Sequence, residues 1–123
     1  MKKTLWVISP NPLSSNKEDL KKGRRLYEQH CLSCHGKKAR GDGPQASSLE
    51  SPPTDLVKSS TQRWQGTFAG IIAEGKAGGP EMPAFRGELS QKEIWQVTSY
   101  VYALKKVKIT EYRERIIFLF AFR

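Results

Sequence analysis

The chain has 123 residues and a net charge of +9 at neutral pH, a length that corresponds to about one domain. Three Trp, five Phe and four Tyr are too many for a disordered chain, and two Cys are too few for a scaffold held by several disulfides. No stretch of the sequence approaches the roughly 20 apolar residues that a membrane-spanning helix needs.

The first residues resemble the beginning of a secretory signal. Two Lys follow Met1, and Leu5 to Ile8 form a short apolar stretch. A true signal needs about 7–15 apolar residues and a cleavage site of small residues, whereas Ser9 and Pro10 interrupt this stretch at once. We therefore interpret residues 1–16 as a degenerate or truncated signal-like segment that forms a flexible N-terminus.

Residues 17–106 have the pattern of one helical domain. A capping box of Ser15 and Glu18 predicts the start of its first helix. Glycine inside a helix costs about 1 kcal/mol relative to alanine, so we expect another helix to approach closely at Gly23. The apolar stripe of this helix follows spacings of three and four and consists of Leu20, Gly23, Tyr27 and Cys31.

Two further helices are predicted after a long loop. The stretch from 36 to 60 is rich in Gly, Pro, Ser and Asp, which is typical of a loop. A short helix over about 65–74 ends at Gly75, and a capping box of Ser90 and Glu93 begins the last helix. The predicted fold class is therefore all-α with long loops, which need something to pack on.

Residues 107–123 form a basic and then apolar C-terminal tail. Its apolar part, residues 116–122, is far too short to span a bilayer. It can contact a membrane, dock on a partner or be the stump of a longer anchor, and nothing in the sequence selects one of these.

The segment Cys31-Leu32-Ser33-Cys34-His35 is a Cys-x-x-Cys-His motif, the attachment signature of a c-type haem. Two thiols three positions apart at the end of a helix can each add to one of two neighbouring vinyl groups of the porphyrin. His35 then lies beneath the iron as an axial ligand. We predict one covalent haem c, held through Cys31 and Cys34.

Other sites that could use these residues are less well supported. A thiol–disulfide redox site is expected next to a βαβ pattern, and the chain has no convincing strands. A zinc site needs four ligands, and the candidates Cys31, Cys34, His35 and His30 include two adjacent residues in an awkward geometry. A simple disulfide between the two cysteines leaves the long loops unexplained.

Met82 is the best candidate for the second axial ligand of the iron. His30 is too near the attachment point to reach the opposite face, and Met1 is terminal. Met82 lies between Pro80 and Pro83 in a loop, whereas a methionine that fills a gap in a core would be expected on an apolar helix face. We therefore predict iron ligation by His35 and Met82, which raises the reduction potential relative to two nitrogen ligands.

With these motifs the chain resembles the class I cytochrome c family over roughly Leu20 to Lys105. The resemblance implies a cytochrome c-like fold, with three to four helices wrapped around one covalently attached haem. It also implies that the carbonyl of a proline after the haem motif accepts a hydrogen bond from the proximal histidine, a role that falls on Pro44. The matching residues are Gly23, Tyr27, Cys31, Cys34, His35, Met82 and the run 94–101.

Further residues are candidates for contacts with the haem. Trp64 is predicted to bind the haem propionates, and Arg63, Arg40 and Arg86 are weaker candidates for the same role. The expected apolar lining of the pocket is Phe68, Ile71, Ile72 and Phe85.

The predicted function is one-electron transfer between redox proteins, with no enzymatic activity of its own. Lys37, Lys38 and Arg40 follow the motif, where they would steer a partner with an acidic surface. We do not expect a nucleic-acid partner, because the basic residues are mixed with acidic ones and lack alternating aromatics. The expected location is the periplasm or another extracytoplasmic compartment.

Two other functions stay open. The chain can be a haem subunit of a multi-subunit dehydrogenase or oxidase complex, with the tail as its docking element. It can also be a five-coordinate haem protein that binds a small gas or peroxide, if Met82 does not ligate the iron.

Overall fold

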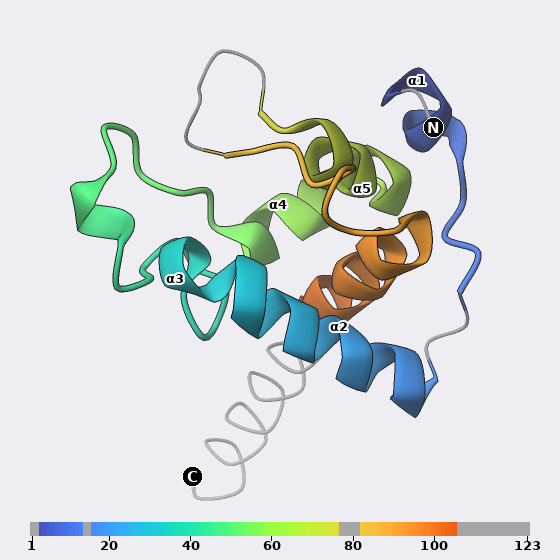
Figure 1. Cartoon of the computed structure of the whole chain (residues 1–123), viewed down its shortest axis with the longest axis horizontal. Helices are drawn as coiled ribbons and strands as arrows, with labels where there is room; N and C mark the ends of the chain where they lie inside the picture. The colour runs from blue at the N-terminus through green and yellow to red at the C-terminus, as the bar shows by residue number, and fades with distance from the viewer. Residues whose placement is uncertain (1–2, 14–15, 77–81, 106–123) are drawn as a thin grey trace, which may run out of the picture.

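The computed structural model describes residues 3–13, 16–76 and 82–105. Within these ranges all regular secondary structure is helical, which confirms the predicted all-α class. The predicted tail, residues 107–123, and the capping residue Ser15 lie outside the described residues. The helices are α1 (Lys3–Ile8), α2 (Lys17–His30), α3 (Leu32–His35), the 3₁₀ turn η1 (Ala46–Ser48), α4 (Leu56–Gln62), α5 (Gln65–Glu74) and a last helix over residues 91–105 (Figure 1).

Helix α2 crosses the helix 91–105, and Gly23 lies at the point of contact. A Cβ atom at this position would overlap the backbone carbonyl of Gln96, so only glycine allows the two backbones to come this close. The side chain of Gln96 donates to Asp19 Oδ1 at 2.9 Å, and the rings of Tyr27 and Tyr100 pack 5.5 Å apart. The predicted close approach at Gly23 is confirmed.

Both long helices begin at capping side chains. Asn16, not Ser15, caps α2, and its Oδ1 accepts from the backbone N–H of Asp19 at 2.8 Å. The predicted capping box of the last helix is present: the backbone N–H of Ser90 donates to Glu93 Oε1, and that of Glu93 donates to Ser90 Oγ. The bond from Ser90 N–H is the main cause that lowers the pKa of Glu93.

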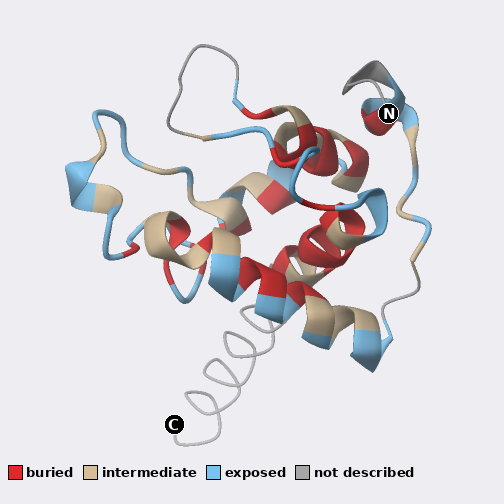
Figure 2. Ribbon diagram, in the orientation of Figure 1, coloured by how far each residue is buried: buried red, intermediate tan, exposed pale blue. Residues whose placement is uncertain are grey.

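The segment predicted as loop, residues 36–60, contains the 3₁₀ turn η1 and the first part of α4, and sequence analysis missed both. Asp55 caps α4 because its Oδ1 accepts from Lys58 N–H at 3.0 Å. Helix α5 spans the predicted residues and ends at Gly75, whose φ of +77° is readily adopted only by glycine. Buried residues gather where α2, α5 and the helix 91–105 face one another (Figure 2).

The N-terminal residues differ from the flexible segment that the sequence predicts. Trp6 of α1 is only 1% exposed, and its ring lies 5.1 Å from that of Trp95. At Gly66 a Cβ atom would overlap the carbonyl of Trp6, so α1 lies directly against α5. Asn11 then donates to both Gln65 Oε1 and Ser99 Oγ, at 2.7 and 2.8 Å. Residues 3–13 are thus part of the packed domain, because the short apolar stretch supplies a tryptophan to its core.

No helix within the described residues combines the length and the apolar character that crossing a bilayer requires.

We predict that Trp6→Ala lowers the free energy of unfolding by about 3–5 kcal/mol, the usual cost of truncating a large buried aromatic side chain. Denaturant unfolding followed by circular dichroism measures this loss. Ile8→Ala on the same helix is the matched control, since Ile8 is 76% exposed, and it should change stability little. Equal effects of the two substitutions would contradict the packing of α1 on the domain.

Candidate functional site

Both cysteines of the motif lie at the junction between α2 and α3. Helix α2 ends at His30, and the backbone N–H of Cys31 still donates to Tyr27 O at 2.8 Å. Cys31 is buried and Cys34 is half-buried, and neither forms a disulfide. The structure therefore presents two free thiols about one helical turn apart, as the motif predicts.

The chemistry of Cys31 does not suit thiol–disulfide exchange. Burial is the main cause that raises the pKa of the Cys31 thiol to about 12, and the nearby Cys34 contributes less to the same increase. Reactive redox cysteines instead have lowered pKa values and are partly exposed. The neutral, buried thiol favours a structural attachment role over a redox-active one.

His35 is buried, and one of its nitrogens is already engaged. Its Nδ1 lies 3.0 Å from the backbone carbonyl oxygen of Thr54, so Nδ1 carries the proton and donates it. Burial lowers the pKa of the imidazole, and the Thr54 carbonyl opposes this effect only in part. The ring is therefore neutral near neutral pH, with the lone pair of Nε2 left to bind a metal.

The partner of His35 differs from the one that the resemblance implied. Pro44 is exposed, and the carbonyl of Thr54 accepts the His35 hydrogen bond that the resemblance assigned to the carbonyl of Pro44. The reason is how the loop folds: Gly43 N–H donates to Cys34 O, and Gln45 N–H donates to Ser33 O. These bonds hold the Pro44 segment along the backbone of α3.

A later part of the same loop returns to the buried histidine. The backbone N–H of Leu56 donates to Ala39 O at 2.7 Å. This bond brings Thr54 and Asp55, the two residues before Leu56, close to α3. Thr54 contributes a backbone carbonyl, which carries no side-chain signature in the sequence. Sequence analysis therefore missed it.

Tyr27 ties the end of the motif back to α2. Its hydroxyl donates to the carbonyl of Gly36 at 2.5 Å, and the ring is 1% exposed. Burial is the main cause that raises the pKa of Tyr27, so the hydroxyl keeps its proton and stays a donor. Gly36 has a φ of +86°, and a Cβ atom there would overlap the carboxylate of Asp42.

Met82 lies in a loop whose ends are bonded to α5. Phe85 N–H donates to Ile72 O at 3.0 Å, and Arg86 N–H donates to Ala73 O at 3.1 Å. The Arg86 guanidinium also lies 3.4 Å from Glu74 Oε2. Met82 is half-buried and packs against the hydrophobic core that contains Cys31 and Phe85. The predicted lining residues Phe68, Ile72 and Phe85 are buried, and Ile71 is half-buried.

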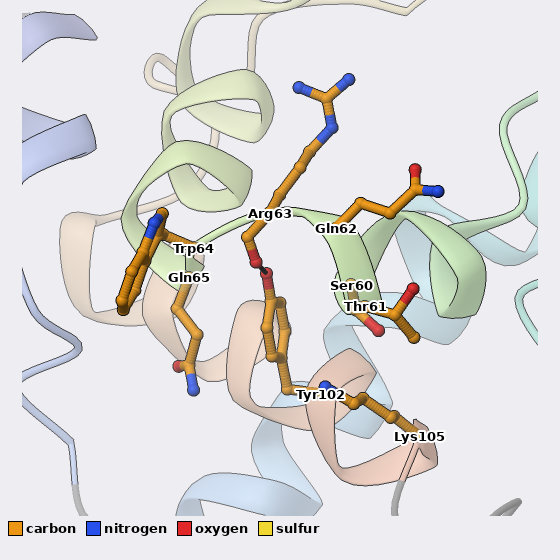
Figure 3. A pocket seen from close by; sticks show the side chains of 8 residues that line it. All are labelled: Ser60, Thr61, Gln62, Arg63, Trp64, Gln65, Tyr102 and Lys105. Atoms are coloured by element: carbon orange, nitrogen blue, oxygen red, sulfur yellow. Dashed lines mark hydrogen bonds between the residues drawn. The ribbon is translucent and has the colours of Figure 1, made fainter.

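The remaining candidates lie at the surface. Trp64 is 84% exposed, and it lines an open pocket to which no residue of the Cys31–His35 motif contributes (Figure 3). Arg40, Arg63 and Arg86 are exposed, and so are Lys37 and Lys38, which directly follow the motif.

His30 does not join the other motif residues as a ligand. Its Nδ1 lies 3.8 Å from Glu88 Oε2, and its ring packs edge-on against Phe85. In the part of the chain that the structure describes, no three His, Cys, Asp or Glu side chains converge as a metal site. The four-ligand zinc site considered from the sequence is therefore not formed.

The donor set fits a covalently attached haem. It combines two unpaired thiols at a helix end, a buried neutral imidazole with Nδ1 fixed by Thr54, and the thioether of Met82 in an anchored loop. Thiols, a neutral imidazole and a thioether are the groups that attach and ligate the iron of this cofactor.

Known proteins match this chain over most of its length. Residues 18–101 match the family model described as cytochrome c oxidase, cbb3-type, subunit III. The chain is 30% identical over 104 residues to the Cbb3-type cytochrome c oxidase subunit CcoP of Azospirillum brasilense, covering 80% of this chain and 33% of that protein. It thus spans about a third of the length of this relative.

Among solved structures, the chain is similar to one in the Kuenenia stuttgartiensis reducing HAO-like protein complex Kustc0457/Kustc0458. The TM-score is 0.65 at 33% sequence identity, and the match covers 76% of this chain and 46% of that one. The region that matches the family model includes the Cys31–His35 motif and Met82 but excludes α1.

We predict that Tyr27→Phe lowers the free energy of unfolding by about 1–3 kcal/mol, because it leaves the buried Gly36 carbonyl without its donor. Stability should also fall as pH rises above about 10, since the unfolded chain then loses the Tyr27 proton that the fold retains. Denaturant unfolding at neutral and alkaline pH measures both effects. Tyr100→Phe, in the other ring of the pair, is the control for the hydrogen bond, because it keeps the bond from Tyr27 to Gly36. Burial also raises the pKa of Tyr100, so this variant loses its own part of the alkaline dependence and keeps that of Tyr27. An unchanged pH dependence in Tyr27→Phe would contradict the assignment.

Proposed function

Because the chain belongs to the family of cbb3-type cytochrome c oxidase subunit III, we propose that it is an electron-transfer domain with a single covalent haem c. Membership makes the chain a c-type cytochrome with a role in electron transport. The observation that carries the finer proposal is the group formed by two free thiols and a neutral imidazole at the α2–α3 junction.

The two cysteines are the attachment points of the cofactor in this proposal. Cys31 and Cys34 would hold the cofactor through thioether bonds, each formed by addition of S–H across a vinyl double bond, which would need no oxidant. The side chains of Cys31 and Cys34 come from the same helical junction, which matches two neighbouring vinyl groups.

His35 and Met82 are the proposed axial ligands. When bound, the haem supplies a one-electron couple at its iron. The chain's own part is to hold the ligands still. The Thr54 carbonyl fixes the His35 ring through Nδ1, and the bonds of Phe85 and Arg86 to α5 anchor the Met82 loop. A rigid ligand set limits the rearrangement that accompanies each change of oxidation state.

Of the functions that the sequence left open, the oxidase-subunit assignment has the support of the relatives. The chain matches a domain-sized part of a longer oxidase subunit, so we propose that it relays electrons within a larger assembly in an extracytoplasmic compartment. Lys37, Lys38 and Arg40 are exposed beside the motif, where they favour approach of an acidic redox partner. Docking through the C-terminal tail belongs to the same proposal.

The attachment proposal predicts how the cofactor behaves when the cysteines are removed. Cys31→Ala and Cys34→Ala should each keep haem on the chain through the remaining thioether, whereas the double substitution should leave haem that acidified organic solvent extracts. Haem staining after denaturing electrophoresis measures covalent attachment. Ser33→Ala, between the two cysteines, is the control and should stain like the unchanged chain. A double variant that retains haem through denaturation would refute attachment by these thiols.

The ligation proposal predicts a specific change of spectrum. The oxidised protein should show the weak far-red sulfur-to-iron absorption band, and Met82→Ala should lose it while its reduced form gains rapid carbon monoxide binding. Met82→His is the matched variant: it should also lose the band, stay closed to carbon monoxide and have a lower reduction potential. Carbon monoxide binding by the unchanged reduced protein would instead favour an open, gas-binding iron.

A further inference from the structure

An open pocket lies between the end of α4, the start of α5 and the last described turn of the helix 91–105. Its volume is about 440 Å³. The hydroxyl of Tyr102 donates to the carbonyl of Arg63 at 2.6 Å, which joins the two sides of the pocket (Figure 3). The lining residues are Ser60, Thr61, Gln62, Arg63, Trp64, Gln65, Tyr102 and Lys105.

The Trp64 side chain lies outside the core. It is 84% exposed, whereas Trp6 and Trp95 are 1% and 4% exposed. It occupies the N-cap position of α5 and makes no side-chain capping bond there, although Ser, Thr, Asp and Asn stabilise that position by about 1 kcal/mol. Exposed tryptophan beside arginine is typical of residues that dominate binding to another protein.

The charge of the pocket selects the kind of partner. Arg63 and Lys105 are its two cations, and none of its eight lining residues is acidic. Trp64 and Lys105 lie on opposite sides of Tyr102 (Figure 3). The pocket thus combines the aromatic side chains of Trp64 and Tyr102 with two cations, Arg63 and Lys105, which complements a segment that carries both an apolar side chain and carboxylates.

We propose that this pocket binds an acidic segment of a partner protein, with an apolar side chain packed on Trp64 and carboxylates paired with Arg63 and Lys105. A lipid surface is a poorer match, because helices that lie on membranes present several apolar side chains along one face and Trp64 is the single large exposed apolar residue of this pocket. The surface is separate from Lys37, Lys38 and Arg40, so docking here leaves the haem motif accessible to electron transfer.

The test places the photoreactive residue p-benzoylphenylalanine at position 64 of the full, haem-loaded chain in its native cells. After irradiation, mass spectrometry identifies the crosslinked product. We expect a crosslink to an acidic segment of another polypeptide, and we expect Arg63→Glu with Lys105→Glu to reduce its yield about tenfold or more, as like charges then face each other. Arg25→Glu with Lys92→Glu is the matched control: it changes the net charge equally at exposed residues outside the pocket and should keep the crosslink.

Several results would overturn the proposal. One is a crosslink to lipid, to residues 106–123 of the same chain or to a segment without acidic residues. Another is the absence of any crosslink. A third is a crosslink whose yield does not change when Arg63→Glu and Lys105→Glu are introduced together. The absorption spectrum of each variant is recorded alongside. A normal haem spectrum with no acidic crosslink rejects the pocket alone, whereas a chain without haem that still forms the crosslink rejects the proposed function alone.

Discussion

The close contact of α2 with the helix 91–105 at Gly23 determines where the candidate site lies. Since no Cβ atom separates Gly23 from the Gln96 carbonyl, the two backbones meet and α2 has one fixed direction. One turn further along, Tyr27 packs on Tyr100 and holds the Gly36 carbonyl. The cysteines and His35 lie between Tyr27 and Gly36, which this bond joins. The position of the motif thus follows from a backbone contact eight residues before its first cysteine.

Burial governs the chemistry of the motif once it is in place. The same dry surroundings raise the pKa of Cys31 and lower that of His35, so both side chains are neutral at the same pH. Neutral thiols and a neutral imidazole are compatible neighbours in a core, where unpaired charges are costly. The Thr54 carbonyl adds direction: by engaging Nδ1 it leaves Nε2 as the nitrogen of His35 that is free to bind a metal. Burial and the bond to Thr54 O thus keep the Cys31 thiol protonated and the His35 ring neutral. These are the protonation states that the proposed haem attachment and iron ligation need.

Local patterns predicted more of the molecule than contacts between distant residues did. The capping box at Ser90 and the glycine stop at Gly75 act over a few residues, so the sequence reveals them directly. The motif at Cys31 likewise carries its chemistry in its spacing. In contrast, Thr54 contributes a backbone atom, and Trp6 gains its place through Trp95 and α5, both far along the chain. Neither contact has a local signal in the sequence. For that reason the hydrogen-bond partner of His35 and the packing of α1 were wrongly predicted.

The two ends of the described chain meet, and this has a consequence for the order of folding. Asn11 bonds Ser99 across 88 positions, and Asp19 bonds Gln96 across 77. Contacts of such long range form late, because the intervening loop must close first. On the ribosome, α1 meets α5 only after residues 65–74 have been synthesised, and α2 meets its partner only after the helix 91–105 has been synthesised. The thiols of the motif are therefore made well before the core that buries them, which leaves an interval in which they are open to solvent and to a bulky cofactor.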